Sequence, residues 1–91
     1  EKMLVLPGGE KFITPRGICV DPAGFLFVAD TEGGKIHVFG PQMDWIAAID
    51  AFEGEKISPS CVAVGWGGEL YAADLASRSI LRFNLEYGDK R

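Results

Sequence analysis

The stretch "PRGICVDPAGFLFVADTEGGKIHVF", Pro15 to Phe39, contains three short apolar segments separated by two turns. The second half of the chain, "PSCVAVGWGGELYAADLASRSILRF" from Pro59 to Phe83, repeats this pattern at a shift of 44 positions, so that Pro15 falls on Pro59. A period of about 40–45 residues with several strands per unit is typical of β-propeller blades. The segments alternate with a period of two and break at Gly and Pro, which excludes a helical repeat.

The regular spacing of turn residues between short apolar segments predicts an all-β chain made of two four-stranded blades. In the first unit we expect strands at Gly17–Asp21, Phe25–Asp30, Lys35–Phe39 and Trp45–Ile49, and in the second at Cys61–Val64, Glu69–Asp74 and Ser79–Asn84. The second unit lacks a fourth strand, but "KMLVL" at Lys2–Leu6 matches the fourth strand of the first unit at the same shift. We therefore divide the single domain 1–91 into an outer strand at 1–6, blade one at 13–50 and three strands of blade two at 57–84.

The first unit resembles a known repeat. "ITPRGICVDPAGFLFVADTEGGKIHVF" is similar to the NHL repeat, in which Pro-x-Gly-Val-Ala-Val-Asp is followed by Gly-x-Ile-Tyr-Val-Ala-Asp-Thr and then by a strand of the type Arg-Ile-x-Val-Phe. The second unit matches less well, because Cys61, Gly65 and Leu75 replace the Gly, Asp and Thr of the pattern. The resemblance implies a six-bladed propeller.

Two blades cannot close a ring, and a lone pair would expose apolar blade faces and strand edges. Three copies would supply six blades, so we expect a homotrimer with strand exchange, which is a ring-closing heterologous contact. The expected interface joins the outer strand of one copy to the last strand of another, through Met3, Leu4, Val5, Leu6, Ile80, Leu81, Arg82 and Phe83. The alternatives are a ring of another size, a fragment excised from a longer propeller, two blades within a larger assembly, and an engineered or natural two-blade unit whose property is self-assembly.

Composition and charge restrict the classes of partner that the chain can bind besides another copy of itself. The net charge is −4 and no apolar run has the roughly 20 residues of a membrane helix, which argues against nucleic acid and membrane. Some NHL propellers bind RNA through a basic face, so this alternative rests on the resemblance. The face that carries residues 7–16, 31–34, 51–60 and 75–78 has mixed charges, which favours a protein, a peptide or a small polar ligand. The candidate binding residues there are Lys11, Arg16, Glu32, Lys56 and Arg78.

We predict no catalytic residue, no metal and no cofactor. Asp30 and Asp74 end equivalent strands, where an Asp that begins a tight turn accepts hydrogen bonds from backbone N–H groups. The alternative is an enzyme like the propeller lactonases and lyases, with an axial metal, but the expected inner strands are apolar. His37 is expected to be solvated or packed rather than a ligand.

The remaining notable side chains are two cysteines and two tryptophans. Cys19 and Cys61 are expected to be buried thiols, because two cysteines are too few for a disulfide scaffold. Trp45 is expected to pack between blades. Trp66, in the "GWGG" turn, is expected either to pack over a neighbouring loop or to anchor a contact.

Overall fold

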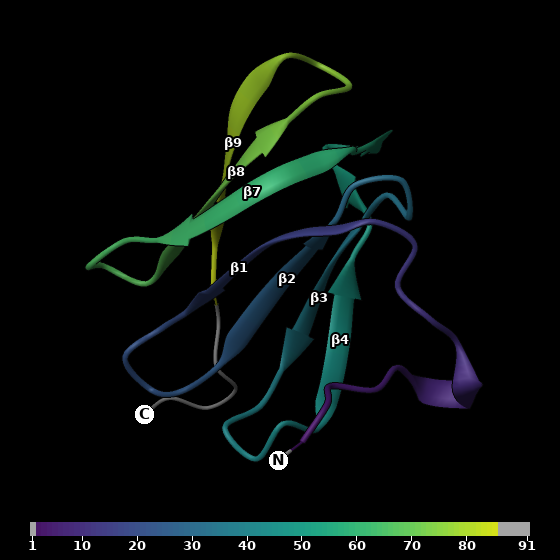
Figure 1. The fold of residues 1–91 in the computed structure, drawn as a ribbon. Helices are drawn as coiled ribbons and strands as arrows, with labels where there is room; N and C mark the ends of the chain where they lie inside the picture. Colours follow the sequence, from purple (N-terminus) through teal and green to yellow (C-terminus); the bar gives the residue numbers. More distant parts are fainter. Residues whose placement is uncertain (1, 86–91) are drawn as a thin grey trace.

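The computed structural model describes residues 2–85, which form two stacked antiparallel sheets and a small hairpin that connects them along the chain (Figure 1). The first sheet is blade one and has four strands in sequence order, while the second is blade two and has three. Blade one contains β1 (Pro15–Val20), β2 (Leu26–Asp30), β3 (Lys35–Phe39) and β4 (Trp45–Ile49); blade two contains β7 (Pro59–Val64), β8 (Glu69–Asp74) and β9 (Ser79–Asn84). Within residues 2–85, no helix has the length and apolar character needed to cross a membrane.

The strands lie where the alternation and the turn residues predicted them. The bounds of β3, β4, β8 and β9 are those expected, and β1 and β7 each begin two residues earlier than expected, at Pro15 and Pro59. Turn residues determine where the first hairpin bends. The Asp21 carboxylate accepts hydrogen bonds from the N–H groups of Ala23 and Phe25. Gly24 then takes a φ of 98°, a left-handed value that glycine adopts at little cost.

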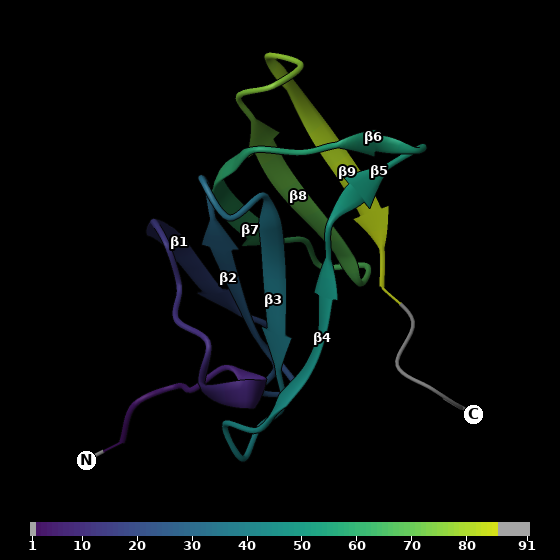
Figure 2. The ribbon, with the colours of Figure 1, turned by 90° about the vertical axis from the view of Figure 1, so that its right-hand side faces the viewer.

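The main hydrophobic core lies between the two sheets, where β7 packs across β1 and β2 (Figures 1 and 2). Residues that pair directly across neighbouring strands share one side of a sheet. Blade one therefore presents Phe27 and Ile36 to this core, together with the half-buried Cys19 and Val38. Blade two contributes Ile57, Leu70, Ala72 and Leu81 from the segment before β7 and from its strands. We call these two surfaces the buried faces of blade one and blade two.

The opposite side of each sheet forms what we call the open face of that blade. On the open face of blade one, Val28 and Phe39 are covered by Leu6, which is 7% exposed, and by the half-buried Leu4 and Phe12. Figure 2 shows this N-terminal segment beside blade one, on the side away from blade two.

The expected outer strand at Lys2–Leu6 is not formed in the single chain. The segment belongs to no sheet, and a 3-10 turn, η1 (Pro7–Gly9), follows it. The physical reason is that the segment buries Leu6 and half-buries Leu4 on blade one within the chain, whereas pairing with β9 requires a second chain. Strand exchange through residues 2–6 therefore stays a prediction.

One element was not expected from the sequence, namely the hairpin of β5 (Ala51–Phe52) and β6 (Glu55–Lys56), which lies in a segment predicted to be a loop. Glu53 and Gly54 form its two-residue turn with φ values of 51° and 83°. Two positive φ values in succession are typical of a type I′ turn, which matches the twist of paired strands. The acid–glycine pair was the available signal, but strands of two residues are too short to show alternation.

Candidate functional site

Two hollows meet at one end of the blades, on either side of the segment 56–58 that leads from the hairpin into β7. The larger hollow has a volume of about 540 Å³ and is lined by Thr31, Glu32, Gly33, Gly34, Lys35, Asp50, Lys56, Ile57 and Ser58. The smaller hollow has a volume of about 270 Å³ and is lined by Phe52, Glu55, Lys56, Ile57, Asp74, Ala76, Ser77, Ser79 and Leu81. Both therefore belong to the loop face predicted to bind a ligand, and they share Lys56 and Ile57.

The β2–β3 turn beside the larger hollow is fixed by the buried carboxylate of Asp30. This carboxylate accepts hydrogen bonds from the backbone N–H groups of Ile13 at 3.0 Å, Thr14 at 2.6 Å and Gly33 at 3.3 Å. Gly33 must lack a side chain, because a Cβ there would lie 2.5 Å from an oxygen of Asp30. The interpretation of this Asp as a turn residue is confirmed.

Asp74 has the same role beside the smaller hollow. Its carboxylate accepts hydrogen bonds from the N–H groups of Ser58 at 2.6 Å, Ala76 at 3.3 Å and Ser77 at 3.1 Å, and from the Ser77 hydroxyl at 2.6 Å. Burial raises the pKa of Asp74, but these hydrogen bonds outweigh burial and hold the pKa below its ordinary value of 3.8. The carboxylate therefore stays ionised at neutral pH.

Hydrogen bonds between the blades hold the wall shared by the two hollows. The Thr31 hydroxyl donates to the carbonyl oxygen of Pro59 at 2.6 Å, and the Ser58 hydroxyl donates to the carbonyl of Thr31 at 3.3 Å. Within blade two, the N–H of Leu75 donates to the carbonyl oxygen of Ser58 at 2.9 Å. Because the loops are tied to both sheets, the hollows exist before any ligand arrives.

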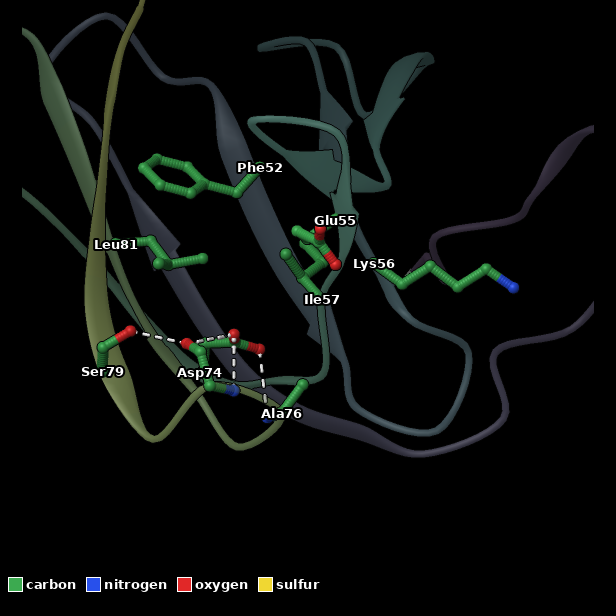
Figure 3. A pocket seen from close by; sticks show the side chains of 9 residues that line it. Phe52, Glu55, Lys56, Ile57, Asp74, Ala76, Ser79 and Leu81 are labelled. Atoms are coloured by element: carbon green, nitrogen blue, oxygen red, sulfur yellow. Dashed lines mark hydrogen bonds between the residues drawn. The ribbon is translucent and has the colours of Figure 1, made fainter.

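The smaller hollow combines an apolar floor with hydroxyl groups on its rim. Phe52, Ile57 and Leu81 line its apolar part, and the Phe52 ring packs edge-to-face against Phe83 with ring centroids 5.4 Å apart. The Ser79 hydroxyl lies 2.5 Å from the Ser77 hydroxyl, which donates to Asp74, and in Figure 3 the Lys56 side chain extends away from both Ser79 and Asp74. This arrangement suits an apolar group that carries a hydrogen-bonding function.

The larger hollow is lined by charged side chains of both signs. Glu32 and Asp50 supply carboxylates, Lys35 and Lys56 supply ammonium groups, and two glycines leave the backbone of the turn accessible. Glu32 and Lys56 were among the predicted binding residues, whereas Lys35 was expected to begin a strand and Asp50 fell between the strand ending at Ile49 and the loop beginning at residue 51. In the smaller hollow Ser79 was expected to begin a strand, and Phe52 lies in the predicted loop 51–60, where only charged residues were chosen as candidates.

The five predicted binding residues do not form one site. Glu32 and Lys56 lie together in the larger hollow, whereas Arg16 lines a separate hollow of about 350 Å³ on the open face of blade one. Lys11 and Arg78 are exposed and belong to none of these three linings. Arg78 lies in the β8–β9 turn, whose residues 76 and 77 line the smaller hollow.

The predicted interface residues also differ in exposure in the single chain. Met3, Val5 and Ile80 are large exposed apolar side chains, and Arg82 is exposed. Leu4 and Phe83 are half-buried, whereas Leu6 and Leu81 are buried within the chain. Leu81 belongs to the core between the blades, because its side chain lies on the same side of the sheet as Ala72.

Three other side chains depart from expectation. Cys61 is exposed in the single chain, because it lies on the open face of blade two, and Cys19 is half-buried. Burial, with a smaller effect of Asp21, raises the pKa of Cys19 to about 11, so its thiol is unreactive at neutral pH. Trp45 does not pack between the two blades of the single chain, because it lies beside Phe39 on the open face of blade one, where its indole N–H donates to Nδ1 of His37 at 3.1 Å.

His37 and Trp66 complete the set of candidates. His37 is buried, as one of the two expected outcomes, and its ring packs edge-to-face against Phe12 at 5.4 Å. Trp66 is fully exposed in the single chain, so packing over a loop is ruled out there. Across residues 2–85, no cluster of three or more His, Cys, Asp or Glu side chains has a geometry suited to a metal ion.

Comparison with known proteins agrees with this architecture. A comparison with curated proteins found no match. Among solved structures, the chain is similar to the selenomethionine-substituted virginiamycin B lyase from Staphylococcus aureus, with a TM-score of 0.61 and 15% identity over 87% of this chain. The chain spans 29% of the length of that structure, and a likeness at this identity shows the fold alone. Residues 12–39 match the model of the NHL repeat, so the chain carries an NHL repeat within a propeller-type fold.

Proposed function

We propose that the chain is a non-catalytic propeller module that binds a protein segment or peptide at the loop face. The observation that carries the proposal is the pair of hollows that share Lys56 and Ile57. A ligand that spans both hollows would place an apolar side chain against Phe52 and Leu81 and polar groups between the charged residues of the larger hollow. Concave sites with an apolar base and a few placed polar groups are typical ligand sites.

The mixed charge of the larger hollow supports a peptide over a nucleic acid. The lining carries two acidic and two basic side chains, Glu32, Asp50, Lys35 and Lys56. Nucleic-acid binding draws its affinity from cationic side chains that neutralise phosphates, and two carboxylates beside the lysines oppose this. A peptide presents both backbone amides and charges of both signs, so it can match this lining.

The non-catalytic part of the proposal is supported by the engagement of the two most buried carboxylates at this face. Asp30 and Asp74 each accept several hydrogen bonds from the backbone, which occupies them as structural acceptors. The similar solved structure is named a lyase, but this likeness concerns the fold. We further propose that the two blades work as part of a closed ring of blades, because each open face leaves large apolar side chains exposed, such as Ile18 in blade one and Ile80 in blade two.

The test is titration of the ¹⁵N-labelled chain with short peptides, observed by NMR. The probes are acetylated nonapeptides with one central Leu or Phe flanked by Lys and Glu. We expect chemical-shift changes at Ile57, Ser77 and Ser79, and a loss of affinity of about tenfold for Lys56→Glu, which corresponds to roughly 1.4 kcal/mol. Lys11→Glu is the matched control, because Lys11 is exposed and outside both hollows. Shift changes confined to the turn of Trp66, or equal affinity for both variants, would contradict the proposal.

A further inference from the structure

Identical residues at equivalent positions of the two blades have opposite exposure. At the shift of 44, Ile36 falls on Ile80, and these side chains are 0% and 68% exposed. Likewise Ile57 corresponds to Ile13, and these are 4% and 64% exposed. The sequence preserves an apolar residue at both copies of each position, although only one copy is buried in the single chain.

The strand pairing explains which surfaces are concerned. The open face of blade two consists of Cys61, Ala63, Tyr71, Ala73, Ile80 and Arg82 and is equivalent, position by position, to the buried face of blade one. The open face of blade one carries Ile18, Val20, Leu26, Val28 and Phe39 and is equivalent to the buried face of blade two. The two open faces of the chain therefore correspond to the two halves of the interface that already joins blade one to blade two.

We propose that a second copy of this chain packs its open face of blade one against the open face of blade two, head to tail. This inference rests on the proposed ring of blades and names the partner that completes it. The contact is heterologous, because two different faces of the chain meet, and it propagates until a ring closes. Three chains would bring together six blades, and the interface between β1 and β7 would continue from one chain to the next.

The N-terminal segment must move when the second copy arrives. Leu4 and Leu6 pack on Val28 and Phe39 of blade one. The residues of blade two that are equivalent to Val28 and Phe39 pack instead against blade one. The cover is incomplete, since a hollow of about 350 Å³ lies beside Leu4 and Ile18. Once displaced, Lys2–Leu6 can pair with β9 of the neighbour, which in residues 2–85 is paired on one side only. The same movement would uncover the open face of blade one and add a strand beside β9 of the neighbour.

The contact between copies is expected to be looser than the contact within the chain. A Cβ on Gly17 would lie 2.9 Å from Cα of Cys61, so the two backbones approach closely at glycine. In the contact between copies Cys61 replaces that glycine, and its Cβ would clash with the second copy's Gly17 unless the blades separate. Arg82 also stands where blade one has Val38, and Leu75 stands where Thr31 donates to Pro59. Assembly should therefore depend on concentration.

The test is the mass of the 91-residue chain by sedimentation equilibrium over a range of concentrations. We expect three times the 9.8 kDa of one chain at high concentration. Ile80→Asp and Ile18→Asp each remove one half of the contact, so each should stay a single chain. Mixed together, they retain one intact contact and should form a dimer. Ala51→Asp, an exposed change on the hairpin outside both open faces, is the control and should assemble normally.

The reactivity of Cys61 gives an independent readout. Its thiol is exposed in the single chain and would be covered by the second copy, so alkylation should slow as the concentration rises and should stay fast in Ile80→Asp. Circular dichroism confirms that each variant is folded, and Val20→Asp replaces Ile18→Asp if the latter is not. A mass of one chain at every concentration, or an assembly that Ile80→Asp leaves unchanged, would overturn the inference. Neither outcome bears on peptide binding, whose residues all lie in the single chain.

Discussion

Asp30 and Asp74 show how one residue type fixes the loop face in both blades. Each is the last residue of the second strand of its blade, is buried, and accepts hydrogen bonds from backbone N–H groups of the turn ahead and of the segment before the first strand. A buried carboxylate is tolerated when such hydrogen bonds compensate for lost solvation. The turn role could be predicted from sequence, because it is local. The bonds to Ile13, Thr14 and Ser58 could not, because they join segments about 16 residues apart.

His37 makes the stability of blade one sensitive to pH. Burial lowers the pKa of His37 below its ordinary value of 6.5; Asp30 and Glu10 oppose this and Lys35 adds to it. Its Nδ1 accepts the Trp45 indole N–H and so must be unprotonated. Because the unfolded chain then binds the proton more readily, stability is complete above about pH 6.5 and is lost as the pH falls below it.

We therefore predict that the free energy of unfolding, measured with urea at fixed low protein concentration, decreases from pH 7.5 to pH 5.5. His37→Gln retains an acceptor for Trp45 but does not titrate, so its unfolding free energy should change less over this range. The lowered pKa of Asp74 contributes only in more acidic solution, below its ordinary value of 3.8. Parallel pH profiles for the two proteins would contradict the assignment to His37.

At the scale of elements, the strands were predictable and their assembly only in part. Period-two alternation and Gly or Pro breaks act within a few residues, so the bounds of β3, β4, β8 and β9 follow from the sequence. The hairpin β5–β6 and the packing of Leu6 on blade one were not predictable, because they depend on tertiary contacts. The same limit applies to the site, whose lining mixes loops with the ends of strands such as Lys35 and Ser79.

The packing of β1 against β7 depends on a glycine at their closest approach. A Cβ on Gly17 would lie 2.9 Å from Cα of Cys61 and 3.3 Å from the carbonyl oxygen of Ser60, and both are backbone atoms. We predict that Gly17→Ala forces the blades apart and lowers the free energy of unfolding by roughly 1–3 kcal/mol. The measurement is urea denaturation followed by tryptophan fluorescence.

The matched control adds the same methyl group where a side chain can yield. A Cβ on Gly67 would lie 3.1 Å from the carboxylate of Glu69, at the end of a flexible side chain. Gly67→Ala should therefore change the stability by less than about 0.5 kcal/mol, as is usual for surface positions. If both variants are equally stable, the contact at Gly17 does not limit the packing of the blades.

At the scale of the whole molecule, equivalent residues of the two blades differ in exposure, and this difference bears on assembly. Ile13 and Ile80 would be unfavourable surface residues in an isolated pair of blades, yet both repeat positions that are buried in the middle of the chain. The polar and bulky exceptions, Cys61, Arg82 and Leu75, all lie on the second unit, which is also the weaker match to the NHL pattern. The second unit therefore combines apolar residues that favour a neighbour with residues that loosen the contact.

Cys61 is the exception whose effect on assembly can be measured most directly. If a second copy packs as proposed, Cys61→Gly restores the close approach found at Gly17 and should tighten the association about tenfold, or roughly 1.4 kcal/mol per contact. The same change should make the single chain slightly less stable, because glycine in a strand costs about 0.5–1 kcal/mol. Cys61→Ser keeps the Cβ and is the control, which should associate like the natural chain. Sedimentation equilibrium of the three proteins decides the matter, since equal association of the glycine and serine variants would show that the backbones of neighbouring copies do not meet at this position.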